Sequence, residues 1–296
     1  MKKFTYYIVD VFAEEKYAGN PLAVVRDCKA MPDDEKQRVA REMNFSETTF
    51  ILSDEKQRNG GYNVRIFTPV EELPFAGHPT LGTAYVIQRE IIGKPVEEVT
   101  LNLKIGQIPV AFTYREKEAD MLWMHQIPPI FGRTFDKHIT CDVLSLQENQ
   151  IDDRFPIQDV STGIHFIIVP LKNLDALKKA KIWREKYFDL VGNLDAKGIL
   201  VFCPEAHRPG NDLSIRVFVD YYGVPEDPAT GSGNGCLAGY LVKYRYFGEN
   251  KIDLRAEQGY EIGRPSLLLL KSEEKGGTID VFVGGRVMYV AKGEFG

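Results

Sequence analysis

The sequence predicts an α+β protein made of two similar halves, each a strand-rich sheet that encloses a buried helix. A glycine-rich stretch occurs twice, because residues 72–87 and residues 226–241 superpose with a shift of 154 residues that places Gly77 on Gly231. The helix expected after each copy is apolar on most faces, which is typical of a buried helix. At 296 residues the chain has room for two domains of ordinary size. We therefore expect a duplicated domain.

The elements of the first half can be assigned in order from their composition and spacing. Pro32 and the acids after it are typical of a helix start, and this helix is expected to end at Asn44. Runs of β-branched and aromatic residues predict strands before the first glycine bend at residues 6–12, 22–25, 45–52 and 62–67.

The second half repeats this order. Residues 215–218 repeat the strand pattern of residues 64–67 just before the second glycine bend. One helix with lysines on one face is expected at residues 174–188. Strands are expected at residues 164–169, 198–203 and 213–220.

The boundary between the halves is predicted near two adjacent prolines, Pro128 and Pro129, since paired prolines break both helix and sheet. The halves are then residues 1–128 and 129–296, and the last strand can pack on the N-terminal half. Residues 278–289 predict a hairpin around Gly284 and Gly285.

Composition excludes several classes of protein. The net charge is −5 and no basic run stands out, which argues against a nucleic-acid partner. No segment approaches the roughly 20 apolar residues of a membrane span, and the polar start does not resemble a signal peptide. The 4 cysteines are scattered without a CxxC pair, as expected of reduced thiols. We expect a cytoplasmic protein.

The two glycine bends are the first candidates for function. Glycine before a helix lets backbone N–H groups point at an anion, and the helix dipole adds to the attraction. The alternative is that Gly77 and Gly231 only allow tight turns. Duplication with different polar residues at the tips favours function, so we expect both bends to face one cleft and to bind a carboxylate. Neither bend is a nucleotide motif.

The polar tips of the bends differ. His78 lies between Gly77 and Pro79 just before a helix, where a structural and a catalytic role are about equally favoured. The 154-residue shift places Ser232 at the matching point, and it is interpreted as a hydrogen-bond donor since the surrounding residues do not form a nucleophile elbow. Asp227 precedes a proline, which is common in plain turns, but it lies close to the second bend.

Glu47 lies between Phe45 and Phe50. A carboxyl group against apolar surface has a raised pKa and can both take and give a proton. The alternative is an exposed Glu at the start of a strand, and these residues alone leave both open. The second half has no acid at the point taken as equivalent, residues 191–193.

Metal and thiol chemistry are not indicated. The histidines form no HxH or HExxH pair, so no metal is expected. Cys236 lies on the predicted buried helix and is interpreted as core. For His165, packing within its strand is favoured over a role in the cleft.

Four motifs resemble those of the phenazine-biosynthesis isomerase family (PhzF-like). They span nearly the whole chain in order, at residues 19–24, 44–50, 75–80 and 227–232. The resemblance implies a diaminopimelate-epimerase-like fold, in which each half is a mostly antiparallel, barrel-like sheet around a central helix. It also implies cofactor-free isomerisation, with Glu47 as the proton shuttle. By the same resemblance His78, Asp227 and Ser232, with Gly77 and Gly231, hold the substrate.

The resemblance also separates this chain from the epimerases of the same superfamily. The positions of their two cysteine bases fall on Ala76 and Thr230, which cannot carry a proton, so a two-thiol epimerase is not expected. The expected reaction is proton transfer between carbons of a small amino-carboxylate of the dihydrohydroxyanthranilate type. A racemase with non-cysteine bases and a non-catalytic carboxylate-binding protein remain alternatives. A homodimer is expected from the family and from the frequency of twofold oligomers.

Overall fold

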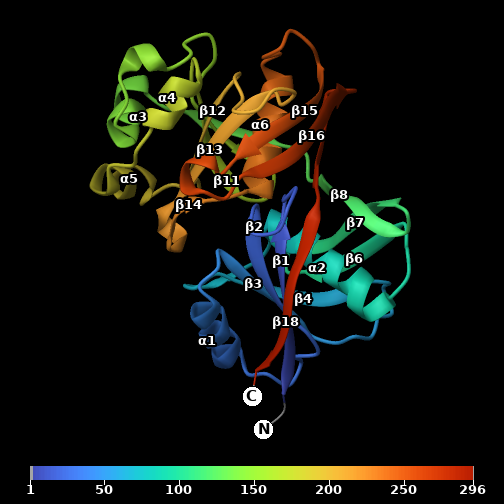
Figure 1. Cartoon of the computed structure of the whole chain (residues 1–296). Helices are drawn as coiled ribbons and strands as arrows, with labels where there is room; N and C mark the ends of the chain where they lie inside the picture. Colours follow the sequence, from blue (N-terminus) through green and yellow to red (C-terminus); the bar gives the residue numbers. More distant parts are fainter. Residues whose placement is uncertain (1–2, 296) are drawn as a thin grey trace. The chain divides into compact units, whose positions relative to one another are not determined.

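The computed structural model describes residues 3–295, which divide into two compact units. The first unit runs to His125 and takes in the chain again from Gly284, and the second unit is Gln126–Val283. Both units contain strands and helices (Figure 1), so the prediction of a mixed α+β fold is confirmed. The division falls before Gln126, close to the paired prolines, and the C-terminal strand belongs to the first unit.

In the first unit, one helix is buried and the rest of the unit is formed mostly by strands. Helix α1 is Asp33–Met43, and α2 is Gly77–Val86, continued by the π-helical turn η1, Ile87–Ile92. The strands are β1 (Phe4–Val11), β2 (Asn20–Val25), β3 (Glu47–Ile51), β4 (Tyr62–Phe67), β5 (Glu72–Leu73), β6 (Glu98–Leu103), β7 (Gly106–Arg115), β8 (Glu118–Gln126) and β18 (Val287–Phe295).

The second unit has more helices. They are α3 (Lys137–Leu144), α4 (Leu174–Lys179), α5 (Arg184–Val191) and α6 (Gly231–Lys243), with short 3₁₀ turns η2 (Glu148–Gln150), η3 (Asp220–Tyr222) and η4 (Tyr260–Ile262). The strands are β9 (Ile130–Thr134), β10 (Gln158–Ser161), β11 (His165–Pro170), β12 (Gly198–Cys203), β13 (Leu213–Val219), β14 (Val224–Asp227), β15 (Lys251–Gln258), β16 (Ser266–Lys275) and β17 (Thr278–Gly285).

The two units share one order of strand pairing. In the first unit β1 pairs antiparallel with β2, β2 parallel with β3, β3 antiparallel with β4, β4 parallel with β6, and β6 antiparallel with β7. The second unit follows the same sequence of senses through β10, β11, β12, β13, β15 and β16. The short strands β5 and β14 pair in the same way with β4 and β13. The repeat seen in the sequence therefore extends to strand register.

A partly buried ion pair is repeated with the strands. Arg65 on β4 donates two hydrogen bonds to Glu72 on β5, at 2.8 and 2.7 Å, and this pair lowers the pKa of Glu72. Arg216 on β13 donates two hydrogen bonds to Glu226 on β14, at 2.9 and 2.7 Å. Paired Arg–carboxylate forks of this kind fix geometry as well as charge. Each fork joins the strand before a glycine bend to the short strand that enters it.

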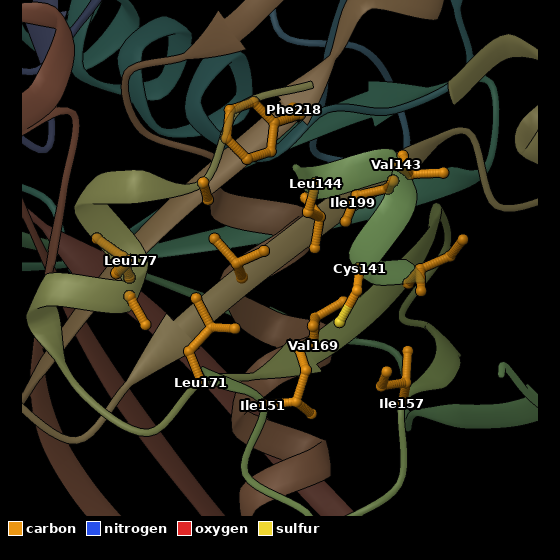
Figure 2. Close-up of a cluster of buried hydrophobic side chains, with 14 of the residues drawn as sticks. Cys141, Val143, Leu144, Ile151, Ile157, Val169, Leu171, Leu177, Ile199 and Phe218 are labelled. Atoms are coloured by element: carbon orange, nitrogen blue, oxygen red, sulfur yellow. The ribbon is translucent and has the colours of Figure 1, made fainter. Parts of the chain in front are cut away.

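The central helices are buried almost all round, as their composition predicts. All residues of α2 are buried, and all of α6 except Lys243. The opposite face of each sheet is covered differently. In the first unit α1 packs over Phe50 and Phe67, whereas in the second unit α3, α4 and α5 cover β11 and β12. Figure 2 shows Cys141 and Leu144 of α3 packed with Val169 of β11 and Ile199 of β12.

One predicted element differs in the structure. The single helix at residues 174–188 is wrong, because α4 ends at Lys179 and α5 begins at Arg184. Between them the amides of Lys181 and Trp183 bond to the carbonyl groups of Leu144 and Val143 at the end of α3, so tertiary hydrogen bonds interrupt the helix.

At the C-terminus, a hairpin was predicted around Gly284 and Gly285. The second of these strands, β18, pairs antiparallel with β1 from Phe295 opposite Phe4 to Val287 opposite Val11. It therefore completes the first unit.

Candidate functional site

The first unit brings Glu47 and His78 together. Glu47 is the first residue of β3 and His78 is the second residue of α2. Below them β3 and α2 are joined by a buried hydrogen bond of 2.8 Å from Thr83 Oγ1 to Thr49 Oγ1. Because alternate residues of a strand share a face, Glu47 lies on the same face as Thr49, towards α2. Its Oε2 atom is 3.4 Å from His78 Nε2.

The charge state of His78 follows from its surroundings. Its side chain is 3% exposed, and burial lowers the pKa of His78 to about 3. The ring is therefore neutral near pH 7 and carries one N–H. The amide nitrogen of Asn20 lies 3.1 Å from Nδ1, and since an amide nitrogen can only donate, Nδ1 is the acceptor. The ring proton is then on Nε2, which faces Glu47.

The surroundings of Glu47 differ in part from the expectation. Its side chain is 14% exposed, so the carboxylate is mostly shielded from water. Phe50, however, packs edge to face on Phe67 in the cluster beneath α1. Glu47 and Phe50 are three positions apart on β3, and residues at this separation point to opposite faces of a strand. The expectation that Phe50 forms part of the environment of Glu47 was therefore wrong.

The register identifies the true counterpart of Glu47. Glu47 stands opposite Leu22 on the neighbouring strand, and Gly198 stands opposite Phe166 at the equivalent point of the second unit. The match of Glu47 to residues 191–193 was therefore wrong, because α5 occupies Val191 and the equivalent strand begins later. A Cβ atom at Gly198 would lie 2.5 Å from the ring of Phe166, which fills the space. The second unit thus has no acid at this position.

The second unit places Asp227, Gly231 and Ser232 around the start of α6. Asp227 ends β14, and Gly231 and Ser232 are the first two residues of α6. Asp227 is 5% exposed, and its Oδ2 atom accepts a hydrogen bond of 2.6 Å from Thr230 Oγ1. The carbonyl group of Gly231 accepts a hydrogen bond of 2.9 Å from the buried amide of Gln126.

Both bends leave the first turn of the helix without a side-chain cap. The N-cap residues are Ala76 for α2 and Thr230 for α6, and neither makes a cap hydrogen bond. Threonine is a common cap, but here its hydroxyl group is directed to Asp227. The N–H groups of a helix start that lacks a cap are suited to an anionic ligand.

A family model described as phenazine biosynthesis-like protein matches residues 9–293. The chain belongs to this family. A trans-2,3-dihydro-3-hydroxyanthranilate isomerase of Pseudomonas aeruginosa is 34% identical over 289 residues, which is 97% of this chain and 98% of the relative. Other curated relatives are named uncharacterised isomerases. These names support the expectation that the chain is an isomerase.

Solved structures agree with the family assignment. A phenazine biosynthesis protein of the PhzF family from Bacillus anthracis superposes with a TM-score of 0.90 at 28% identity, covering 100% of this chain and 99% of the other. A hydroxyproline epimerase from Agrobacterium vitis gives a TM-score of 0.64 at 11% identity over 100% of this chain and 91% of its own. At that identity the likeness concerns the fold alone.

Cys236 and His165 were interpreted from the sequence as packing residues. Cys236 is buried in α6, and burial raises the pKa of its thiol to about 12, so it is no base near neutral pH. His165 Nδ1 lies 2.9 Å from an oxygen of Asp159. Within residues 3–295, no group of three or more His, Cys, Asp and Glu side chains is arranged to hold a metal ion.

Three residues around the site had no role in the sequence-based expectations. Asn20 belongs to the motif at residues 19–24, but nothing in that motif indicates its contact with His78. Thr230 was noted only as a position where the epimerases carry a cysteine. No sequence pattern indicated a role for Gln258. It reaches the second bend only because β13 pairs in parallel with β15, which is distant in the sequence.

Proposed function

We propose that this chain is a cofactor-independent isomerase that moves a proton between two carbon atoms of a small amino-carboxylate. Glu47 is the general acid and base in this proposal. The observation that carries it is the contact of Glu47 with a neutral, buried His78. The isomerase names of the relatives support the reaction class.

The proposed reaction is balanced within the substrate. The carboxylate of Glu47 takes a proton from one carbon. The electron pair of the broken C–H bond forms a new double bond to the neighbouring carbon, and the π pair of the existing double bond moves to its far carbon. The acid proton of Glu47 exchanges with solvent, and Glu47 then delivers a proton from this exchanged pool to the far carbon of that conjugated system. No electron leaves the substrate, so the step requires no oxidant or reductant.

His78 has a defined part in this proposal. Its Nε2–H group can donate to Glu47 or to negative charge that develops on the substrate, and Asn20 keeps the ring in that tautomer. A neutral donor does not compete with Glu47 for the substrate proton. A single preorganised donor of this type contributes on the order of 10²–10³-fold in rate.

Asp227, Gly231 and Ser232 of the second unit, with Gly77 of the first, are proposed to act on the same substrate molecule. The uncapped starts of α2 and α6 support binding of its carboxylate. Asp227 is proposed to hold the amine or to orient His78. We also propose that each half is a barrel-like sheet closed around its central helix, which the repeated strand pairing supports.

The test is deuterium incorporation from solvent. The first compound is trans-2,3-dihydro-3-hydroxyanthranilate, because a relative of this chain is named for its isomerisation. Further small amino-carboxylates follow it, each incubated with enzyme in D₂O and analysed by NMR. The proposal predicts an isomerised product with deuterium at a single carbon. Unchanged compounds without deuterium across the panel would contradict it.

We also propose that the enzyme is a homodimer and that it is located in the cytoplasm. In the described part of the chain, no helix is long and apolar enough to cross a membrane. The dimer is proposed from the prevalence of twofold oligomers. Light scattering at working concentration would give the mass of two chains, and a monomer mass would refute the dimer.

A further inference from the structure

Asp227 is supported by two buried side chains, Thr230 and Gln258. Thr230 Oγ1 lies 2.6 Å from Asp227 Oδ2, and Gln258 Nε2 lies 3.0 Å from Thr230 Oγ1 and 2.7 Å from the backbone oxygen of Asp227. Asp227 is 5% exposed and Gln258 is 1% exposed. These contacts lie entirely within the second unit.

The direction of each hydrogen bond in this group is determined by backbone atoms. The N–H of Thr230 donates to Gln258 Oε1 at 3.2 Å, and Gln258 Nε2 donates to the carbonyl group of Asp227. Both amide atoms of Gln258 are thereby assigned. Its Nε2 also donates to Thr230 Oγ1, so the hydroxyl hydrogen of Thr230 must point to the carboxylate of Asp227.

The first unit has the same backbone with apolar residues at all three points. The 154-residue shift places Leu73 at the position of Asp227 and Ala76 at that of Thr230. Strand register places Leu103 at the position of Gln258, since Asn102 pairs with Asn63 and Glu257 pairs with Ser214. The fold therefore forms this bend without any polar group at the three positions.

We propose that Thr230 and Gln258 are positioning residues, which hold the carboxylate of Asp227 in one orientation for the substrate. This inference rests on the proposed function, in which Asp227 contacts the substrate. A hydroxyl bond to a carboxylate is among the stronger hydrogen bonds and fixes rotation of the carboxyl group. Reacting groups need such fixed geometry, because small displacements lower the rate strongly.

A double-mutant cycle on isomerase turnover tests the coupling. Thr230→Val removes the hydroxyl group at constant shape and is expected to lower kcat/KM about 10- to 100-fold, the value of a hydrogen bond to a charged group. Thr230→Ser should restore most of the loss. In an Asp227→Asn background, Thr230→Val should cost less than threefold. Equal losses in both backgrounds would show a structural role only and overturn the inference.

A second variant uses the residues that the first unit already accommodates. Thr230→Ala, Asn234→Thr and Gln258→Leu together copy Ala76, Thr80 and Leu103. Thr80 Oγ1 bonds to the carbonyl group of Ala76, as Asn234 Nδ2 bonds to that of Thr230, so this helix contact is retained. The triple variant should fold with wild-type circular dichroism and lose at least tenfold in kcat/KM. Wild-type turnover in the folded variant would overturn the inference.

A measurement without turnover separates this inference from the proposed function. The chain is labelled with ¹³C at aspartate carboxyl groups, and the signal of Asp227 is identified by its absence in Asp227→Asn. Thr230→Val should move this signal at constant pH, and Thr230→Ser should restore it. An unmoved signal would refute the positioning role. A signal that moves, in an enzyme inactive on the whole amino-carboxylate panel, would refute the proposed function and retain the Thr230–Asp227 contact.

Discussion

The two glycine bends share the same backbone structure but carry different side chains. The first carries His78 beside Glu47 over apolar support from Leu73, Ala76 and Leu103. The second carries Ser232 and Asp227 over polar support from Thr230 and Gln258, and has Gly198 where the first has Glu47. In both, an Arg–Glu fork joins the strands that lead into the bend. The bends and their Arg–Glu forks are thus duplicated, whereas the pair of Glu47 and His78 occurs in one unit.

This difference separates residues that build a bend from residues that act at it. The forks, the buried helices and the strand order recur, so they are what the fold requires. Glu47, His78, Asp227 and Thr230 do not recur, so folding alone does not require them. The proposed mechanism, with one acid–base group on one side of the substrate, requires such asymmetry.

Replacing the ionisable carboxyl group of Glu47 is expected to have the largest effect. Glu47→Gln keeps the shape of the side chain and should lower kcat and deuterium exchange on the order of 10²–10⁴-fold, the usual contribution of a positioned acid or base. Stopped assays with NMR detection measure both. Glu42→Gln, at an exposed position of α1, is the matched control. Retention of most activity by Glu47→Gln would leave Asp227 as the candidate base.

Breaking the buried fork of the second unit should come next. Arg216→Met leaves Glu226 with an unpaired charge and is expected to cost about 3–5 kcal/mol of unfolding free energy, as for other buried pairs. Arg216 also donates to the carbonyl groups of Leu177 and Ala180. Arg65→Met should cost less, since Glu72 keeps Lys104 at 2.7 Å. Urea denaturation of both variants measures the order, and a larger loss for Arg65→Met would contradict it.

Exchanging the tip of the first bend for that of the second tests whether the tips are equivalent. His78→Ser should lower kcat/KM on the order of 10²–10³-fold, because the donor that faces Glu47 is lost. Ser232→Ala measures the donor of the other bend under the same assay. Activity near wild type in His78→Ser would mean that the two tips are interchangeable.

The burial of His78 should appear in the pH dependence of stability, as a gradual change that is small for each step in pH. Its pKa is about 3 in the folded protein against 6.5 for the free side chain, so between these values the unfolded chain binds a proton that the folded chain does not. Stability should therefore fall as the pH falls from 6.5, by up to about 1.4 kcal/mol per pH unit from this group. Urea titrations at several pH values measure the slope, and His78→Gln should flatten it. Equal slopes would contradict a buried neutral ring.

The sequence predicted the parts of the molecule that depend on local pattern. Strand β4 and strand β12 were predicted with the bounds that the structure gives, and Asn44 ends α1 in a left-handed conformation. The membership in the family followed from motifs at the bends. These features depend on patterns within a few residues: runs of strand-forming residues, residues typical of helix ends, and the spacing of glycines.

Features that depend on distant partners could not be predicted. The break between α4 and α5 depends on carbonyl groups of α3, about 40 residues earlier in the chain. The face of Phe50 depends on register, and the role of Gln258 depends on a parallel pairing across the unit. Nothing in the neighbouring residues of Gln258 distinguishes a buried polar support from an ordinary strand end.

The pairing of β18 with β1 has a consequence for the order of folding during synthesis. The unit that holds Glu47 and His78 needs residues from both ends of the polypeptide, whereas Gln126–Val283 is continuous. On the ribosome the C-terminal module can therefore become compact before the N-terminal one is complete, which reverses the usual vectorial order. Nascent chains stalled before residue 287 has left the exit tunnel should show protease resistance for the continuous module first. The unit that holds the proposed acid–base pair, Glu47 and His78, would then be complete only after β18 has left the ribosome.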